Sequence, residues 1–173
     1  DIAHWGMGWD ETGPVEIETT GEWPTSGVYN SPLRYWTNAK YADGTPLVIA
    51  GGYEEIWGGT KWIGEYGWIW VDRGQFETEP ESLKREVIGP DEIRLYKSRD
   101  HWQNFVDCVR SRGQTITPAE YAHRSASLGH LGMISLKVGR KIHWDPATET
   151  IINDPEAERL LSRSYRKPWQ LPE

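Results

Sequence analysis

The side chains best suited to chemistry in this 173-residue chain are five histidines and one cysteine, Cys108. His123 and His130 are seven residues apart, and the segment from Ser125 to Leu136 carries no Asp, Glu, Lys or Arg. On a straight helix that separation is about two turns, roughly 10 Å, which is too far for both imidazoles to bind one metal ion. The spacing favours two buried, hydrogen-bonded histidines over a metal site, and a single cysteine excludes a cysteine metal cluster.

His4 and Trp5 form a second candidate pair. They lie in a segment with the pattern of a last helical turn, which Gly6 and Gly8 end. The chain starts at Asp1 without a methionine or a capping sequence, so we expect the beginning of that helix to precede this chain. Two interpretations of His4 and Trp5 stay open at this point: they line a pocket, or they belong to a core.

Common nucleotide-binding and hydrolase motifs are absent from the sequence. It has no G-x-G-x-x-G, no G-x-x-x-x-G-K-[ST] and no G-x-S-x-G. We therefore expect no cofactor-binding residue and no esterase-type nucleophile in this chain, and the histidine spacing and the single cysteine likewise predict no metal-binding residue. The net charge of -7, with no basic cluster, argues against a nucleic-acid partner. No apolar run approaches the roughly 20 residues of a membrane span, and 37% hydrophobic with 26% charged residues is typical of a globular protein.

The element at the centre of the chain is a predicted hairpin between Gly58 and Glu77. Its turn falls at residues 64–67, between segments rich in aromatic and β-branched residues. In its second strand Trp68 and Trp70 alternate with two aliphatic residues, so both faces of the strand are apolar and both need a cover. We expect helices on one face, and another domain or a second copy of the chain on the other.

The remaining pattern has strands first and helices second. Further strands are predicted at Val15–Thr19, Tyr35–Tyr41, Leu47–Ala50 and Gln75–Glu79, followed by a helical turn at Glu81–Val87. Helices are predicted over Trp102–Val109, after the capping box Thr117–Glu120, and after Asp154. This order predicts an α+β fold: an open-faced, mainly antiparallel β-sheet with helices packed on one face.

The uncharged segment from Ser125 to Leu136 predicts a helix that is buried nearly all round. Gly129 and Gly132 would each cost a helix about 1 kcal/mol relative to alanine, so we expect them to permit close approach to a neighbouring element. The 11 tryptophans favour an aromatic core and interface, with a surface that stacks on sugar rings as the alternative.

Six motifs, in order along the chain, resemble the second domain of the Gfo/Idh/MocA family of oxidoreductases in its bacterial branch. They are D-I-A-H-W-G-M-G from Asp1, Y-A-D-G from Tyr41, G-E-Y-G-W-I-W-V-D-R-G from Gly64, D-H-W-Q-N-F-V-D-C-V-R-S-R from Asp100, T-P-A-E-Y-A-H-R-S-A-S-L-G-H-L-G from Thr117 and K-P-W-Q-L from Lys167. Because they span the chain, we expect residues 1–173 to form one C-terminal substrate and oligomerisation domain, without the Rossmann domain.

The resemblance implies a parent protein that is a two-domain, NAD(P)-dependent oxidoreductase acting on a sugar, polyol or glycoside. The family's lysine lies in an E-K-P motif that this chain lacks. Its catalytic histidine opens an H-x-x-D pattern whose aspartate matches Asp1, and so falls just before this chain. The resemblance therefore implies that NAD or NADP binds the full-length parent, that this chain alone is inactive, and that His4, Trp5 and His123 contact substrate.

The sequence allows two alternative functions: a non-catalytic carbohydrate-binding module and a structural assembly module. The long uncharged helix argues against the first, since such modules usually consist of short strands with a row of exposed aromatic residues. The expected partners are a second copy of the chain through a sheet face, the Rossmann domain and a sugar-like small molecule, without nucleic acid or membrane. The compartment stays open: cytoplasmic or, as the resemblance implies for exported relatives, periplasmic.

Overall fold

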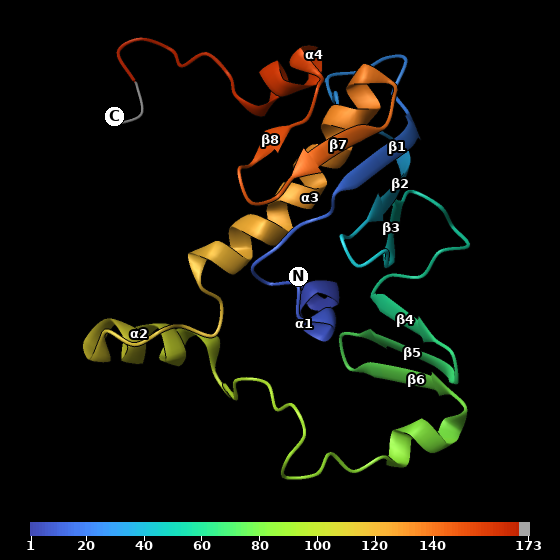
Figure 1. The fold of residues 1–173 in the computed structure, drawn as a ribbon, viewed down its shortest axis with the longest axis vertical. Helices are drawn as coiled ribbons and strands as arrows, with labels where there is room; N and C mark the ends of the chain where they lie inside the picture. The colour runs from blue at the N-terminus through green and yellow to red at the C-terminus, as the bar shows by residue number, and fades with distance from the viewer. Residues whose placement is uncertain (170–173) are drawn as a thin grey trace. The chain divides into compact units, whose positions relative to one another are not determined.

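The computed structural model describes residues 1–169; residues 170–173, and with them the end of the K-P-W-Q-L motif, lie outside the described residues. The described chain forms two compact units, one of Asp1–Glu11 with Trp57–Ser125, the other of Thr12–Ile56 with the chain from Ala126 onward. Its strands make two sheets, and every strand pairing in them is antiparallel (Figure 1). The predicted α+β class and antiparallel character are confirmed.

The first unit contains the predicted hairpin. Its elements are α1 (Ile2–Met7), β4 (Thr60–Gly64), β5 (Gly67–Asp72), β6 (Gln75–Glu79), the 3-10 turn η1 (Glu81–Arg85) and α2 (His101–Ser111). The three strands form a sheet of their own in the order β4-β5-β6, so the strands of the chain are shared between two sheets rather than one. Gly67 opens β5 with φ 152, and a Cβ there would lie 2.0 Å from the carbonyl oxygen of Glu79.

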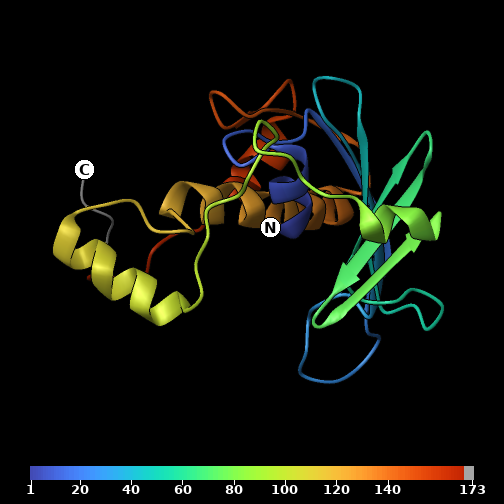
Figure 2. The same cartoon turned by 90° about the horizontal axis from the view of Figure 1, so that it is seen from below.

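The second unit contains a five-stranded sheet. Its strands are β1 (Glu16–Glu22), β2 (Arg34–Lys40), β3 (Pro46–Gly51), β7 (Ile142–Asp145) and β8 (Thr150–Ile151), in the order β3-β2-β1-β7-β8. The helix α3 (Ala119–Val138) begins in the first unit, and its later part lies on one side of β1, β2 and β3 (Figure 2). Buried side chains from both layers form the core: Ile17, Ala39, Leu128, Leu131, Ile134, Ile142, Trp144, Ile151 and Ala157.

The helix α3 approaches the sheet closely at Gly132. A Cβ built on this residue would lie 3.2 Å from the hydroxyl oxygens of both Thr19 and Thr37, which are hydrogen-bonded to each other at 2.9 Å. The expected close approach is therefore confirmed at Gly132. At Gly129 the expectation of a close approach is wrong, because a Cβ built on this residue would meet no atom of the described residues within 4 Å. Gly129 and His130 are exposed, so α3 has an uncovered side and is not buried all round.

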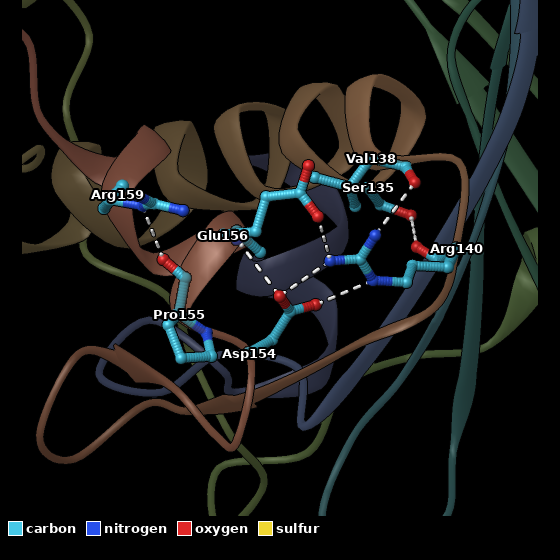
Figure 3. Close-up of polar contacts among 8 residues, drawn as sticks. Ser135, Val138, Arg140, Asp154, Pro155, Glu156 and Arg159 are labelled. Carbon is cyan, nitrogen blue, oxygen red and sulfur yellow. Dashed lines mark hydrogen bonds and ion pairs between the residues drawn. The ribbon is translucent and has the colours of Figure 1, made fainter.

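The turn after α3 is held to the chain's last helical elements by Arg140 (Figure 3). Its Nε and Nη2 donate to the two carboxylate oxygens of Asp154 at 2.9 and 2.7 Å, and Nη2 also donates to Glu156 at 2.8 Å. The hydrogen bond from Arg140 lowers the pKa of Asp154. Asp154 also accepts from the N–H of Ala157, so it caps α4 (Pro155–Glu158), which leads into η2 (Arg159–Leu161). The predicted cap at Asp154 is confirmed.

Candidate functional site

His4 lies inside α1 and is buried, with 1% of its surface exposed. Its ring meets the ring of Trp9 edge to face, with centroids 6.2 Å apart and planes at 87°. The helix ends at Gly8, where φ is 69, and the N–H of Trp9 then donates to the carbonyl of His4 at 3.0 Å. Burial lowers the pKa of His4, which favours the neutral imidazole, a group with one donor and one acceptor nitrogen.

The close contact of α1 with β4 depends on Gly6. A Cβ built on Gly6 would lie 2.5 Å from the indole ring of Trp62, a distance that side chains do not tolerate. Gly6 therefore allows Trp62 to pack on α1, and Gly8 rather than Gly6 ends the helix. Trp5, on the same helix, is half-buried.

His123 lies near the start of α3 and is exposed. One residue further, Arg124 donates through Nε to Glu120 at 2.7 Å, an ion pair one turn apart on the helix. The structure thus brings His4 and Trp5 together on α1 and places His123 on another helix. A shared substrate site for the three stays a prediction.

Sequence reasoning missed Trp9 and Trp62, the two indoles that contact α1. A signal for Trp62 was present, because the predicted turn at 64–67 sets the hairpin register. In that register Trp62 pairs with Ile69, and so lies on the face opposite Trp68 and Trp70. No comparable signal identified Trp9, which follows the helix directly.

The other face of the three-stranded sheet carries an aromatic and aliphatic surface, here called the tryptophan face. It consists of Trp57, Lys61, Ile63, Trp68 and Trp70, and Glu77 and Glu79 of β6 lie beside it on the same face of the sheet. The ring of Trp57 lies 5.8 Å from that of Trp70, whose Nε1 donates to the carbonyl of Gly58 at 2.9 Å. The ammonium of Lys61 lies 3.9 Å from the ring centroid of Trp68, within cation–π range. Ile63 and Trp57 are strongly exposed, at 79% and 73%.

Residues 1–169 do not form a Rossmann-type dinucleotide-binding unit. A dinucleotide-binding unit needs neighbouring parallel strands joined by a helix, with a glycine-rich turn between them. The described strands pair only in antiparallel fashion, and the glycine motif is absent from the sequence.

The same part of the chain brings no three His, Cys, Asp or Glu side chains together in a way that could hold a metal ion. Within it, no helix combines the length and apolar character needed to cross a membrane.

Comparison with known proteins agrees with this architecture. Residues 1–171 match the model of an oxidoreductase family's C-terminal alpha/beta domain. A solved structure described as an NAD-binding protein from Listeria innocua shares the fold, with a TM-score of 0.54 and 12% identity. The alignment covers 82% of this chain and 51% of that one, so this chain spans about half the length of the protein it matches. No curated protein matches the chain.

The fold and the match define the class: an α+β domain of the kind that forms the C-terminal part of oxidoreductases. More specifically, the chain belongs to the Gfo/Idh/MocA family and corresponds to its C-terminal domain.

Proposed function

We propose that this chain forms part of the substrate site in an NAD(P)-dependent oxidoreductase that acts on a sugar, polyol or glycoside. The observation that carries the proposal is the family match over residues 1–171. In this proposal NAD or NADP binds the first domain of the parent protein, since the described residues lack the parallel strands and the glycine-rich turn of a Rossmann-type dinucleotide site. The chain alone is inactive, and its part is to bind and orient the substrate.

His4, Trp5 and His123 are the proposed substrate contacts. Imidazole nitrogens can exchange hydrogen bonds with hydroxyl groups, and an indole ring offers an apolar face to sugar C–H groups. His4 is buried beside Trp9 and burial lowers its pKa, so in this proposal it is a neutral group that forms the inner part of the pocket wall. No proton transfer is assigned to it.

A substrate screen tests this function. The parent protein, expressed from its complete coding sequence, is mixed with NAD or NADP and a panel of sugars, polyols and glycosides, and formation of reduced nicotinamide is followed by absorbance. We expect turnover with at least one compound, whereas the 173-residue chain alone should give no turnover and no calorimetric binding of either cofactor. Micromolar cofactor binding by the chain alone, or a parent inactive with the whole panel, would contradict the proposal.

We also propose that the chain self-associates through the tryptophan face. Gly6 of α1 packs against Trp62 on the opposite face of the same sheet, while Ile63 and Trp57 are strongly exposed. Clustered exposed apolar groups commonly mark interfaces, and a two-fold pairing of identical surfaces is the commonest arrangement.

Light scattering tests the association. Ile63→Lys should convert a dimer into a monomer, because two charged side chains would then be buried in the interface. Ile93→Lys, which changes another strongly exposed isoleucine outside the sheet, should leave the dimer intact. A monomeric wild-type protein at high concentration would refute the interface.

A further inference from the structure

The apolar side of α2 is exposed. Four large side chains lie on it at helical spacing, and they are here called the α2 stripe: Trp102 (78% exposed), Phe105 (58%), Val106 (39%) and Val109 (50%). Residues three and four positions apart lie on one side of a helix, so the four side chains form one continuous surface. An exposed apolar surface of this kind commonly marks the place where another protein element packs.

A different side of α2 holds the helix to its own chain. Cys108 is buried there, and its thiol donates to the carbonyl of Gln114 at 3.2 Å. Asn104 accepts from the N–H of Ile116 at 3.0 Å, and its amide donates to the hydroxyl of Tyr96 at 2.8 Å. With 3.6 residues per turn, Asn104 and Cys108 lie about 130° from the middle of the α2 stripe. These contacts therefore fix the helix by one side and leave the α2 stripe outside them.

The helix is also ordered at its start. The carboxylate of Asp100 accepts from the backbone N–H of Gln103 at 2.7 Å and so caps the first turn. The side-chain amide of Gln103 then donates to Asp107, one turn further on, at 2.7 Å. A helix that is already formed loses less conformational entropy on docking than a segment that must fold first. The α2 stripe is thus a preformed surface.

The polar side of α2 does not suit a membrane surface. Helices that lie on anionic lipid carry several lysines or arginines beside their apolar side. The sequence of α2 has one arginine, Arg110, and one aspartate, Asp107, so its formal charges balance. The α2 stripe therefore suits the apolar surface of another protein element.

The size of the α2 stripe distinguishes between kinds of protein partner. An aromatic side chain buries at most about 150–250 Å², so Trp102 and Phe105 with the two partly exposed valines stay below the roughly 800 Å² per partner that a stable complex of separate molecules needs. Ile93 and Leu95, in the segment before α2, are exposed as well. With them the surface reaches the size of an interface between domains of one chain, about 600–1,500 Å² in total.

The covalent connection of the chain favours the first domain of the proposed parent as this partner. The chain spans about half the length of the solved structure it matches, which leaves room for a further domain. In the proposed parent that domain joins at Asp1, and Asp1 and α2 belong to the same compact unit. A tethered partner is present at an effective concentration in the millimolar range, so a small apolar surface is sufficient to hold it.

We infer that the α2 stripe is the docking surface for the first domain of the parent protein. Helices cover both faces of a Rossmann-type sheet, so that domain offers a helix on which Trp102 and Phe105 can pack. The contact holds the cofactor-binding domain against the unit that carries His4 and Trp5. The inference rests on the proposed function for the existence of that domain, and the α2 stripe contains none of the proposed substrate contacts.

Thermal unfolding of Phe105→Lys tests the docking in two proteins: the parent, expressed from its complete coding sequence, and the 173-residue chain. In the parent the variant should lower the unfolding temperature by about 5 °C or more, because a charged side chain would be buried between the domains. In the chain alone, where Phe105 is exposed, the change should be less than about 2 °C. Asp107→Lys places the same side chain on the polar side of α2, so it should change either protein by less than about 2 °C.

Hydrogen exchange followed by mass spectrometry gives a second readout. The backbone amides of α2 should exchange at least about tenfold more slowly in the parent than in the 173-residue chain, because docking suppresses local opening of the helix. Phe105→Lys should remove most of this difference, and Asp107→Lys should retain it.

Three results would overturn the docking surface. The first is an equal loss of stability in the parent and in the chain alone, because the α2 stripe would then pack within this chain. The second is an unchanged unfolding temperature in both proteins, with equal exchange of α2 in the two. The third is light scattering in which Phe105→Lys dissociates an oligomer of the 173-residue chain, because the α2 stripe would then be a contact between copies. None of these measurements depends on turnover, so a parent inactive with every sugar would contradict the proposed function and leave the docking surface standing.

Discussion

At the scale of single residues, the hydroxyl of Ser135 makes a hydrogen bond that a neighbouring strand would otherwise make. β7 pairs with β1 only at Glu16 and Ile17, so the N–H of Thr19 has no strand partner on that side. Ser135, fully buried on α3, accepts from this N–H at 3.0 Å and donates to the carbonyl of Arg140 at 2.8 Å. The side chain of Ser135 therefore links α3 to the strand β1 and to the turn at Arg140 through hydrogen bonds.

We predict that Ser135→Ala lowers the free energy of unfolding by about 1–3 kcal/mol, because it leaves a buried backbone N–H and a carbonyl without this partner. Urea unfolding measures the effect. Ser125→Ala, on the same helix, should change the stability by less than about 0.5 kcal/mol. Equal stability of the Ser135 variant and the wild type would show that water or a local shift replaces the hydroxyl.

The buried His4 gives the protein a predictable pH dependence. Its pKa is lowered in the folded state, so between its folded value and about 6.5 the unfolded chain binds more protons, and stability falls as the pH falls. The slope should be at most about 1.4 kcal/mol per pH unit. Hydrogen bonds lower the pKa values of Asp145 and Asp154, so the contribution of these carboxylates to folding stability is lost only below about pH 4.

Urea unfolding between about pH 7.5 and about pH 5 measures this slope, to which the amino group of Asp1 also contributes because burial lowers its pKa. His4→Gln should flatten the slope, and His101→Gln, at an exposed histidine of α2, should retain it. If His4→Gln leaves the slope unchanged, the pH dependence of stability comes from another group.

At the scale of elements, two glycines of α3 should respond in opposite directions. Gly129→Ala should stabilise the protein by about 0.5–1 kcal/mol, because the added methyl meets nothing and alanine favours the helix. Gly132→Leu should destabilise it by about 1–3 kcal/mol or more, because the side chain would push α3 away from Thr19 and Thr37. Thermal unfolding of both variants tests these two predictions. A Gly132→Leu variant as stable as the wild type would contradict the close contact of α3 with Thr19 and Thr37.

The elements were predictable from the sequence because periodicity and turn residues act locally. The hairpin of β4 and β5, the strand β6, the start of α3 and the cap at Asp154 all follow from such signals. How the strands divide into sheets was not predictable, because it depends on pairing between segments far apart in the chain, such as β1 with β7.

Periodicity also does not say what covers an apolar face. Trp102, Phe105, Val106 and Val109 of α2 have the predicted helical spacing, yet they are exposed in the structure. The same reasoning applies to the exposed side of α3 around His130. For the candidate site, His4 could be singled out from its helix pattern, but its contact with Trp9 required the fold.

At the scale of the whole molecule, we propose that the two tasks of an oxidoreductase fall to different parts of the parent protein. The antiparallel sheets and helices of this chain match a C-terminal family domain, and residues 1–169 form no Rossmann-type dinucleotide-binding unit. In this proposal the chain orients the substrate, and another part of the parent holds the cofactor. That division is the central claim, and the kinetics of the parent protein with altered contacts test it directly.

The measurement is kcat/KM of the parent for its best substrate, with His4→Gln, His4→Ala, His123→Ala and the control His101→Ala. We predict that His4→Ala and His123→Ala each lower kcat/KM by about tenfold or more, equivalent to about 1.4 kcal/mol, with cofactor affinity unchanged. The control should match the wild type, and His4→Gln should recover part of the loss by restoring a hydrogen-bonding group. Since His123 is exposed, its replacement should leave the fold intact. Unchanged kcat/KM in both alanine variants, with intact thermal unfolding, would contradict the account and leave this domain a scaffold.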